Sequence, residues 1–299
     1  MKLSAWNAAV LPAGIFILLL HLTVPSAGLW AGTAFALLGL VLVGIPHGSL
    51  DHIITEKTGE AGSFSLVRFL VMYLLTMLVY ALFWVWLPAL SLLFFLLMSA
   101  WHFGETDLEE SSVSQQLFAR LAQLLYGSLL LFGLLANDPE QTVAILASLL
   151  GESAVLAGFL NLTEAYPWLR FTEFYALALR IALVRSDVFD QLRLGLVLAI
   201  ALFLPLLEGF LLYFCHHHAW VNLLRVKERL YEEGPAGLKN MIRDMMPFSL
   251  ISVFGIIILV ASSPLWLSQV NPVLLFFILI SVLTLPHAGI MSRFYLQEG

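Results

Sequence analysis

Charged side chains are scarce in this sequence. Of its 299 residues, 11% are Asp, Glu, Lys or Arg and 61% are hydrophobic, whereas a soluble domain carries about 25% charged residues. So few charges cannot cover the surface of a water-soluble protein of this size. The composition therefore excludes a soluble globule, a disordered chain and a nucleic-acid-binding protein. We predict an all-α, polytopic membrane protein that forms a single integral membrane domain over residues 1–299.

Cysteine and lysine are also rare. The single cysteine, Cys215, excludes structural disulfides and every metal site built from several cysteines. The four lysines (Lys2, Lys57, Lys227 and Lys239) lie outside the long apolar runs. A retinal-binding opsin needs a lysine within a span for its Schiff base, so the chain is not an opsin.

Apolar runs long enough to cross a bilayer fill most of the chain. About 20 apolar residues in a helix span the hydrocarbon core, and proline, glycine and charged residues mark the breaks between runs. We predict about ten spans, at residues 8–26, 28–47, 65–87, 88–104, 117–135, 141–160, 191–207, 209–224, 246–268 and 270–288. Residues 165–190 carry three arginines among aromatic residues and leucines, which predicts an amphipathic helix at the membrane interface.

The distribution of Lys and Arg predicts the orientation, because cytoplasmic loops are enriched in these residues. The densest basic cluster consists of Arg225, Lys227, Arg229, Lys239 and Arg243. This cluster is expected to be cytoplasmic. Counting ten spans outward from it places both termini on the cytoplasmic side of a cell inner membrane.

Four histidines are expected to meet inside this bundle. Under the predicted topology, His47, His102, His218 and His287 lie near the cytoplasmic ends of four helices. Polar groups inside a membrane are costly and usually mark a working site, although interfacial helix ends are the alternative. Imidazole suits zinc, copper, iron and nickel. The spacing alone leaves open an oxygen-activating iron or copper site and a zinc hydrolase.

A carboxylate follows each of the first two histidines. Asp51 comes four residues after His47, and Asp107 comes five residues after His102. A carboxylate often accepts the second N–H of a metal-bound imidazole. We therefore expect Asp51 and Asp107 to orient histidine ligands, with solvation of a helix end as the alternative.

Three histidines are consecutive at positions 216 to 218. Consecutive residues on a helix point in three different directions. No more than one or two of these imidazoles can therefore face one site.

At these residues the sequence resembles the Brp/Blh family of bacterial and archaeal membrane β-carotene 15,15′-dioxygenases. The matching pieces are Pro46-His47-Gly48-x-x-Asp51, His102-Phe103-Gly104-x-x-Asp107, Tyr213-Phe214-Cys215-x-x-His218 and Leu283-Thr284-Leu285-Pro286-His287. They follow the family's order and cover the chain from about residue 40 to residue 290. The resemblance implies a non-haem, Fe(2+)-dependent oxygenase that cleaves the central double bond of β-carotene with O₂, giving two molecules of all-trans-retinal.

The iron ligands that the resemblance implies are His47, His102 and His218. The family has a second histidine four residues after the position of His218, and this chain has Asn222 there. The fourth ligand is therefore open among Asn222, His217 (or its neighbour His216) and His287. This departure leaves, as alternatives, altered specificity or carotenoid and retinoid binding without cleavage. A transporter with a histidine path for protons or metal is another alternative.

The substrate that the resemblance implies, β-carotene or a related polyene, would enter from the bilayer, and its retinal product could supply a rhodopsin. Aromatic residues that flank the histidines are the expected lining of an apolar substrate tunnel: Trp101, Phe103, Tyr213, Phe214 and Trp220. Ordinary packing or lipid contact is the alternative for each of them.

Overall fold

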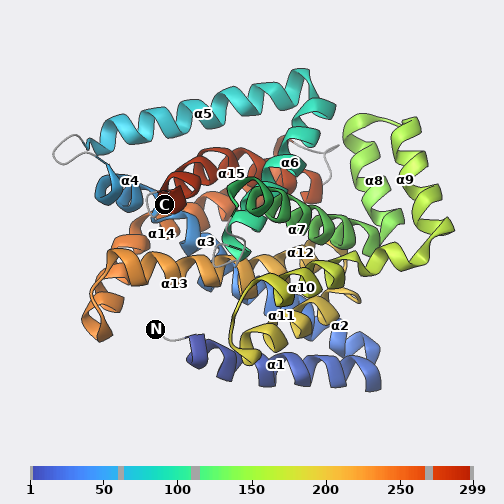
Figure 1. Cartoon of the computed structure of the whole chain (residues 1–299). Helices are drawn as coiled ribbons and strands as arrows, with labels where there is room; N and C mark the ends of the chain where they lie inside the picture. The colour runs from blue at the N-terminus through green and yellow to red at the C-terminus, as the bar shows by residue number, and fades with distance from the viewer. Residues whose placement is uncertain (1–2, 60–63, 109–114, 267–271, 297–299) are drawn as a thin grey trace.

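The chain folds into a bundle of helices (Figure 1). A computed structural model describes residues 3–59, 64–108, 115–266 and 272–296, and no β-strand occurs within these ranges. The first half contains α1 (Leu3–Thr23), α2 (Pro25–Gly39), the π-helical segment η1 (Leu40–Gly44), α3 (Ile45–Gly48), α4 (Asp51–Thr58), α5 (Leu66–Trp86), α6 (Pro88–Asp107) and α7 (Gln116–Asn137). The second half contains α8 (Pro139–Leu150), α9 (Ala154–Ala165), the 3-10 segment η2 (Pro167–Phe171), α10 (Thr172–Leu183), α11 (Val188–Ala201), α12 (Leu206–Tyr213), the π-helical segment η3 (Phe214–His218), α13 (Ala219–Leu230), α14 (Gly234–Trp266) and α15 (Pro272–Leu296). The prediction of an all-α fold is confirmed.

Seven stretches within the described ranges are long and apolar enough to cross a membrane. They are Trp6–Thr23, Pro25–Thr58, Leu66–Trp86, Pro88–Asp107, Gln116–Asn137, Gly234–Leu259 and Leu275–Leu296. Each overlaps one predicted span, but the count of ten is not confirmed. The two termini and residues 267–271, where the last two predicted spans meet, lie outside the described residues.

The three remaining predicted spans have a different local structure. The run at 141–160 is divided at Gly151, whose φ of +69° ends α8 and separates it from α9. The run at 191–207 ends earlier, because α11 stops at Ala201 and Pro205 precedes the next helix. The run at 209–224 belongs to the continuous succession of α12, η3 and α13.

Prolines start several helices, as the sequence predicts for two of the breaks. α2 begins at Pro25 and α6 begins at Pro88. Proline suits the first turn of a helix, because the N–H that it lacks has no partner there in any case. The predicted interfacial helix at 165–190 corresponds to η2 and α10, but Arg180 is buried rather than turned to the surface.

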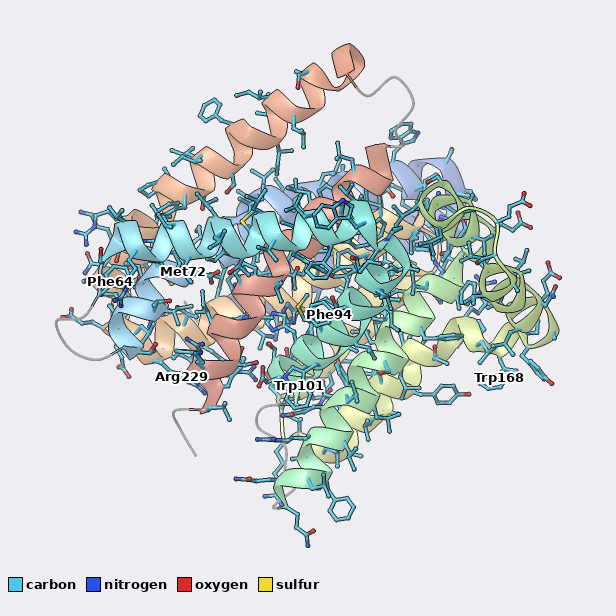
Figure 2. The ribbon with its side chains drawn as sticks, turned by 90° about the horizontal axis from the view of Figure 1, so that it is seen from above. Phe64, Met72, Phe94, Trp101, Trp168 and Arg229 are labelled. Carbon is cyan, nitrogen blue, oxygen red and sulfur yellow. The ribbon has the colours of Figure 1, made fainter. Side chains whose placement is uncertain are left out.

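Apolar side chains cover much of the outside of the bundle. Met72 on α5 and Phe94 on α6 are 57% and 47% exposed, respectively, and α14 extends past the other helices at one edge (Figure 2). In α14, Ile251 and Phe254 are also largely exposed. Large exposed apolar surfaces of this kind are expected where lipid, rather than water, surrounds the protein.

Two glycines bring α6 and α7 into backbone contact. A Cβ added to Gly104 on α6 would lie 1.8 Å from the carbonyl oxygen of Gln123, and one added to Gly127 on α7 would lie 1.9 Å from that of Ala100. Ala100 and Gly104 are four residues apart, as are Gln123 and Gly127, so both contacts fall on one face of each helix. Small residues at this spacing allow helices to approach closely in a membrane. This contact fixes the end of α6 that carries His102 and Asp107.

A buried carboxyl group lies at the start of α10. Gly133 on α7 leaves room for Glu173, because a Cβ at Gly133 would lie 1.9 Å from Oε2 of Glu173. This Oε2 atom is buried and has no hydrogen-bond partner among the described residues. Burial raises the pKa of Glu173 to about 7, because a carboxylate loses its hydration there.

Replacing Glu173 with glutamine is expected to stabilise the protein increasingly as the pH rises. The folded state holds this proton more tightly than the unfolded chain, so wild-type stability falls between about pH 4.5 and pH 7. Glutamine has no such penalty, and the gain should approach about 3 kcal/mol above pH 7, at 1.36 kcal/mol per pKa unit. Thermal unfolding in detergent at several pH values measures the gain. The exposed Glu164 provides the control: Glu164→Gln should leave the pH profile unchanged, and an equal gain from both variants would contradict the prediction.

Candidate metal centre

Four buried imidazoles come together from four parts of the chain. His47 lies in α3, His102 in α6, His218 in η3 and His287 in α15. The ring of His102 lies 4.9 Å from that of His218 and 5.2 Å from that of His287, and the rings of His47 and His287 are 4.4 Å apart. The structure thus joins the four histidines for which the sequence predicts a common site.

Three of these histidines form a group with the spacing of metal ligands. One ring nitrogen from each of His47, His102 and His218 lies within 4.8 Å of the other two. The Nε2 atoms of His102 and His218 are 3.3 Å apart. Two nitrogens bound to one ion at about 2.1 Å in tetrahedral geometry are about 3.4 Å apart. The spacing of this pair therefore suits a shared metal ion.

One further ring nitrogen in the cluster has no partner within the protein. Nε2 of His287 is buried without a hydrogen-bond partner among the described residues. Leaving buried polar atoms unpaired costs about 1–3 kcal/mol each. A metal ion at the centre would engage the ring nitrogens that face one another.

Asp107 lies at the centre of the contacts that hold His218. Its Oδ2 atom accepts hydrogen bonds from the hydroxyls of Tyr126 and Tyr213 at 2.8 and 2.7 Å, and its Oδ1 atom lies 3.6 Å from Nδ1 of His218. A proton on this Nδ1 leaves Nε2 with a free lone pair that faces His102. The carboxylate that follows His102 in sequence therefore lies beside an imidazole from another helix, at a distance longer than a hydrogen bond.

The other two histidines of the consecutive run point away from the metal group. Nε2 of His216 donates to the carbonyl of Phe35 at 3.0 Å, and its ring stacks on that of Phe35. Nδ1 of His217 accepts from Arg193 at 3.3 Å, while its Nε2 atom lies 3.4 Å from Oδ2 of Asp107. Since Arg193 can only donate, the proton of His217 belongs on Nε2 and points at Asp107.

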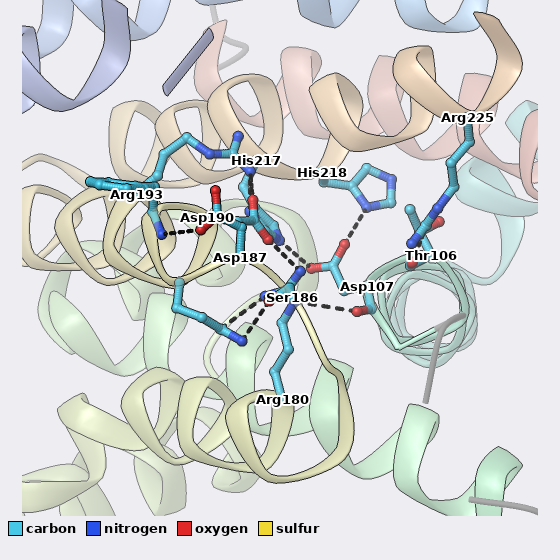
Figure 3. A network of polar contacts seen from close by, with 12 residues as sticks. Thr106, Asp107, Arg180, Ser186, Asp187, Asp190, Arg193, His217, His218 and Arg225 are labelled. Carbon is cyan, nitrogen blue, oxygen red and sulfur yellow. Dashed lines mark hydrogen bonds and ion pairs between the residues drawn. The ribbon is translucent and has the colours of Figure 1, made fainter. Parts of the chain in front are cut away.

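A buried network of charges extends from this point (Figure 3). Asp190 pairs with both Arg180, at 2.7 Å, and Arg193. Arg180 also donates to the backbone carbonyl of Asp107 at 3.3 Å. The network therefore returns to the end of α6 from two sides, through His217 and through Arg180. Buried ion pairs add little net stability, but these contacts fix where Asp107 lies.

Asp51 pairs with the fourth imidazole. Its Oδ1 atom accepts from Nδ1 of His287 at 2.7 Å, and its Oδ2 atom accepts from the hydroxyl of Tyr73 at 2.9 Å. The sequence places Asp51 four residues after His47, but the carboxylate serves a histidine 236 residues away. Both predicted carboxylates thus lie at the site, each beside a histidine of another helix.

Two π-helical segments pack against one another beside the metal group. A Cβ added to Gly44 in η1 would lie 2.8 Å from Sγ of Cys215 in η3. A π-helical turn contains an extra residue, so it rotates the side chains that follow it, and such turns are frequent at functional sites. η1 precedes His47 and η3 ends at His218. The sequence analysis did not predict these segments, because no residue pattern distinguishes them from ordinary helix.

An apolar cavity of about 510 Å³ adjoins the imidazoles, a volume within the usual range of small-molecule sites. His47, His102 and His287 belong to its wall. The rest of the wall is mainly apolar and comes from α5, α6, α12, α14 and α15, with Phe69, Leu74, Met77, Phe95, Phe210, Phe248, Ile251, Phe276 and Leu283 among its residues.

The five aromatic residues expected to line a tunnel have different positions. Phe103 and Phe214 belong to the cavity wall. Trp101, Tyr213 and Trp220 do not: Tyr213 binds Asp107, Trp220 stacks on Trp6 at 4.0 Å, and Trp101 is partly exposed on α6 (Figure 2). Three further aromatic wall residues, Phe69, Tyr73 and Phe248, come from α5 and α14, which carry none of the clustered histidines, so sequence proximity could not indicate them.

Comparisons with known proteins relate the sequence to one family. No solved structure matches the chain. A 78-residue segment is 41% identical to a protein of uncultured marine bacterium 66A03 named beta-carotene 15,15′-dioxygenase, and the match covers 25% of this chain and 28% of that relative. A profile of the family described as beta-carotene 15,15′-dioxygenase matches residues 38–295. Because this match extends over most of the chain and includes all four clustered histidines, the protein belongs to the beta-carotene 15,15′-dioxygenase family.

Proposed function

We propose that this protein is a non-haem iron oxygenase that cleaves β-carotene at its central 15,15′ double bond with O₂, giving two molecules of all-trans-retinal. The observation that carries this proposal is the group of His47, His102 and His218, whose imidazoles converge beside a large apolar cavity. Family membership supports the carotenoid as the substrate class.

The three histidines would hold Fe(2+) as neutral imidazoles. When bound, the iron would supply the activation of O₂ that no amino-acid side chain can provide. Asp107 would keep a proton on Nδ1 of His218 so that Nε2 remains free for the metal. The side of the group that faces the cavity is mainly apolar.

The cavity would bind the polyene by burying its hydrocarbon surface. Several polar side chains in the wall are hydrogen-bonded within the protein: Ser49 donates to the carbonyl of Pro46 at 2.7 Å, and Thr284 donates to that of Ile280 at 2.7 Å. Their hydrogen bonds leave little polarity for a ligand to satisfy, so a hydrocarbon chain loses nothing by replacing water there. The same walls would exclude water from the reacting bond.

The reaction balances without an added acid, base or reductant. The central carbon–carbon double bond is broken, and each of its two carbons receives one oxygen atom of a single O₂ molecule as an aldehyde. The residues of this chain then need only to hold the polyene and the metal in register. Asp51 and Asp107 accordingly serve as orienters of imidazoles and not as proton-transfer groups.

Binding of a carotenoid or retinoid without cleavage is the second candidate. The residue that favours it is Asn222, which stands where the resemblance to the family implies a histidine. Both functions need the same cavity and differ in whether the polyene is broken. The first candidate includes further proposals. The substrate would come from the bilayer of the inner membrane, O₂ would be the co-substrate, and the retinal would pass to a rhodopsin. Both termini would lie in the cytoplasm.

Expression of the chain in bacteria that accumulate β-carotene tests the proposal, with a host carrying the empty vector beside it. We expect two molecules of retinal for each carotene lost. Under ¹⁸O₂, with immediate reduction of the aldehydes to retinol to prevent exchange with water, both product molecules should carry the label. Unchanged carotene with folded, iron-loaded protein would reject cleavage of β-carotene and support binding alone.

A further inference from the structure

We propose that His287 supplies the fourth nitrogen ligand of the metal centre and that Asp51 and Tyr73 hold it in place. This proposal rests on the proposed function in one respect, namely that His47, His102 and His218 hold a metal ion. It assigns the position that the departure at Asn222 leaves open.

The ring of His287 lies beside two of the other imidazoles. His287 lies 4.4 Å from the ring of His47 and 5.2 Å from that of His102, and it stands edge-on to both, at 73° and 90°. Edge-on rings can direct nitrogen lone pairs, which lie in the ring plane, toward one point. His287 is 6% exposed and also belongs to the cavity wall. Its ring therefore borders both the other imidazoles and the cavity that would receive the polyene.

The two ring nitrogens of His287 differ in their hydrogen bonding. Nδ1 is held by Oδ1 of Asp51 at 2.7 Å, whereas Nε2 is buried and has no hydrogen-bond partner among the described residues. Since a carboxylate only accepts, the proton of a neutral His287 belongs on Nδ1, and Nε2 presents a lone pair. A carboxylate that holds one imidazole nitrogen while a metal takes the other is the usual arrangement of histidine ligands.

The carboxylate of Asp51 is itself held in place by a hydrogen bond. Asp51 is 3% exposed, begins α4 and accepts a hydrogen bond from Tyr73 on α5 at 2.9 Å. His47 and Asp51 belong to the same short stretch of chain, so one segment would supply a ligand and the residue that orients another. The chain of contacts from Tyr73 through Asp51 to His287 joins α5, α4 and α15 at the metal group.

The helix that carries His287 also contains a proline. Pro286 lies within α15 and immediately precedes His287. Proline removes one helical hydrogen bond and cannot pack against the preceding turn as other residues do. His287 is not within the 4.8 Å group of the other three, so it must move toward them to complete the set. The adjoining cavity leaves space for this small movement, and the helical hydrogen bond that Pro286 cannot make does not oppose it.

Asn222 lacks the carboxylate partner and the place in the cavity wall that His287 has. Both of its amide atoms are buried without a hydrogen-bond partner among the described residues, and it does not belong to the cavity wall that includes His287. An amide is also a weaker ligand for iron than an imidazole. The structure thus assigns the fourth position to α15 rather than to the turn that follows His218.

Metal titration of the purified protein in detergent tests this assignment. Co(II), added without oxygen, serves as the probe, because its visible absorption reports the number and kind of its ligands independently of catalysis. We expect His287→Ala to weaken binding by about 100-fold and to change the spectrum, and Asp51→Asn to weaken binding by about 10- to 100-fold. Asn222→Ala should leave the affinity within about two-fold of wild type and the spectrum unchanged.

A rescue experiment separates a ligand from a structural residue. In His287→Gly, added imidazole should restore the wild-type Co(II) spectrum, because a free imidazole can fill the vacated place, whereas a structural defect would not respond. Circular dichroism and thermal unfolding establish that each variant is folded. If Asn222→Ala changes the spectrum and His287→Ala does not, the assignment is overturned, although the metal centre stands. A wild-type protein that binds no metal would instead overturn the proposed function.

Discussion

Replacing His102 with alanine is expected to abolish metal binding and retinal formation together. Nε2 of His102 lies 3.3 Å from Nε2 of His218, and its ring neighbours those of His218 and His287. Removal of this imidazole leaves at most two members of the three-histidine group in place. We expect the metal content of the purified protein to fall below a tenth of wild type and retinal formation to fall at least 100-fold. Elemental analysis and chromatography of cell extracts measure the two effects.

His21 provides the matched control for this experiment. It lies near the end of α1, where its ring stacks on that of Phe203 at 3.7 Å and takes no part in the four-imidazole cluster. His21→Ala should therefore retain both metal and activity. Full metal content in folded His102→Ala would show that the histidines do not form the centre we describe.

Replacing Gly127 with alanine is expected to destabilise the protein strongly and to empty the metal site. The new Cβ would lie 1.9 Å from the carbonyl oxygen of Ala100, a distance that only separation of α6 and α7 can relieve. Overpacking of a close contact costs about 1–3 kcal/mol, occasionally more, and here the obstacle is backbone, so we expect about 3 kcal/mol or more. The movement would also draw Tyr126, the next residue to Gly127, away from Asp107.

Thermal unfolding in detergent, combined with metal analysis, measures this effect. Gly158 on α9 provides the control, because nothing lies within 4 Å of the position its Cβ would take. Gly158→Ala should leave stability unchanged or raise it by up to about 1 kcal/mol, since alanine favours helix over glycine. Equal stability of the two variants would mean that α6 and α7 do not pack as closely as the structure shows.

The sequence was sufficient to predict the class of fold and to identify the four histidines that cluster in the structure. Long apolar runs and few charges leave a chain little alternative to membrane helices, because backbone polar groups must be paired within each segment. Pro25 and Pro88 mark two of the breaks between such runs, because each begins a new helix. The histidines stand out because polar residues are few in these runs. The sequence did not determine the number of spans, because short helices such as α8, α9 and α11 are as apolar as longer ones.

The partnerships within the site depended on tertiary structure. Asp51 follows His47 in sequence but holds His287, and Asp107 follows His102 but lies beside His217 and His218. Sequence spacing describes neighbours along one helix, whereas a metal site is assembled across several. The π-helical segments η1 and η3 further change which side chains face inward, and no periodic pattern announces them.

The buried charged residues also depended on tertiary structure. The sequence identifies Arg180 only as one of the cationic residues in a stretch of mixed polarity, which predicts an exposed position at an interface. In the fold, Asp190 pairs with both Arg180 and Arg193 out of contact with solvent, and Arg180 also donates to the backbone carbonyl of Asp107. Composition and periodicity alone therefore determined that this protein is a helical membrane protein with a set of histidines to place. Only the packing of helices distant in sequence decided which nitrogens face one another, because that depends on contacts such as Gly127 on Ala100, which no local pattern encodes.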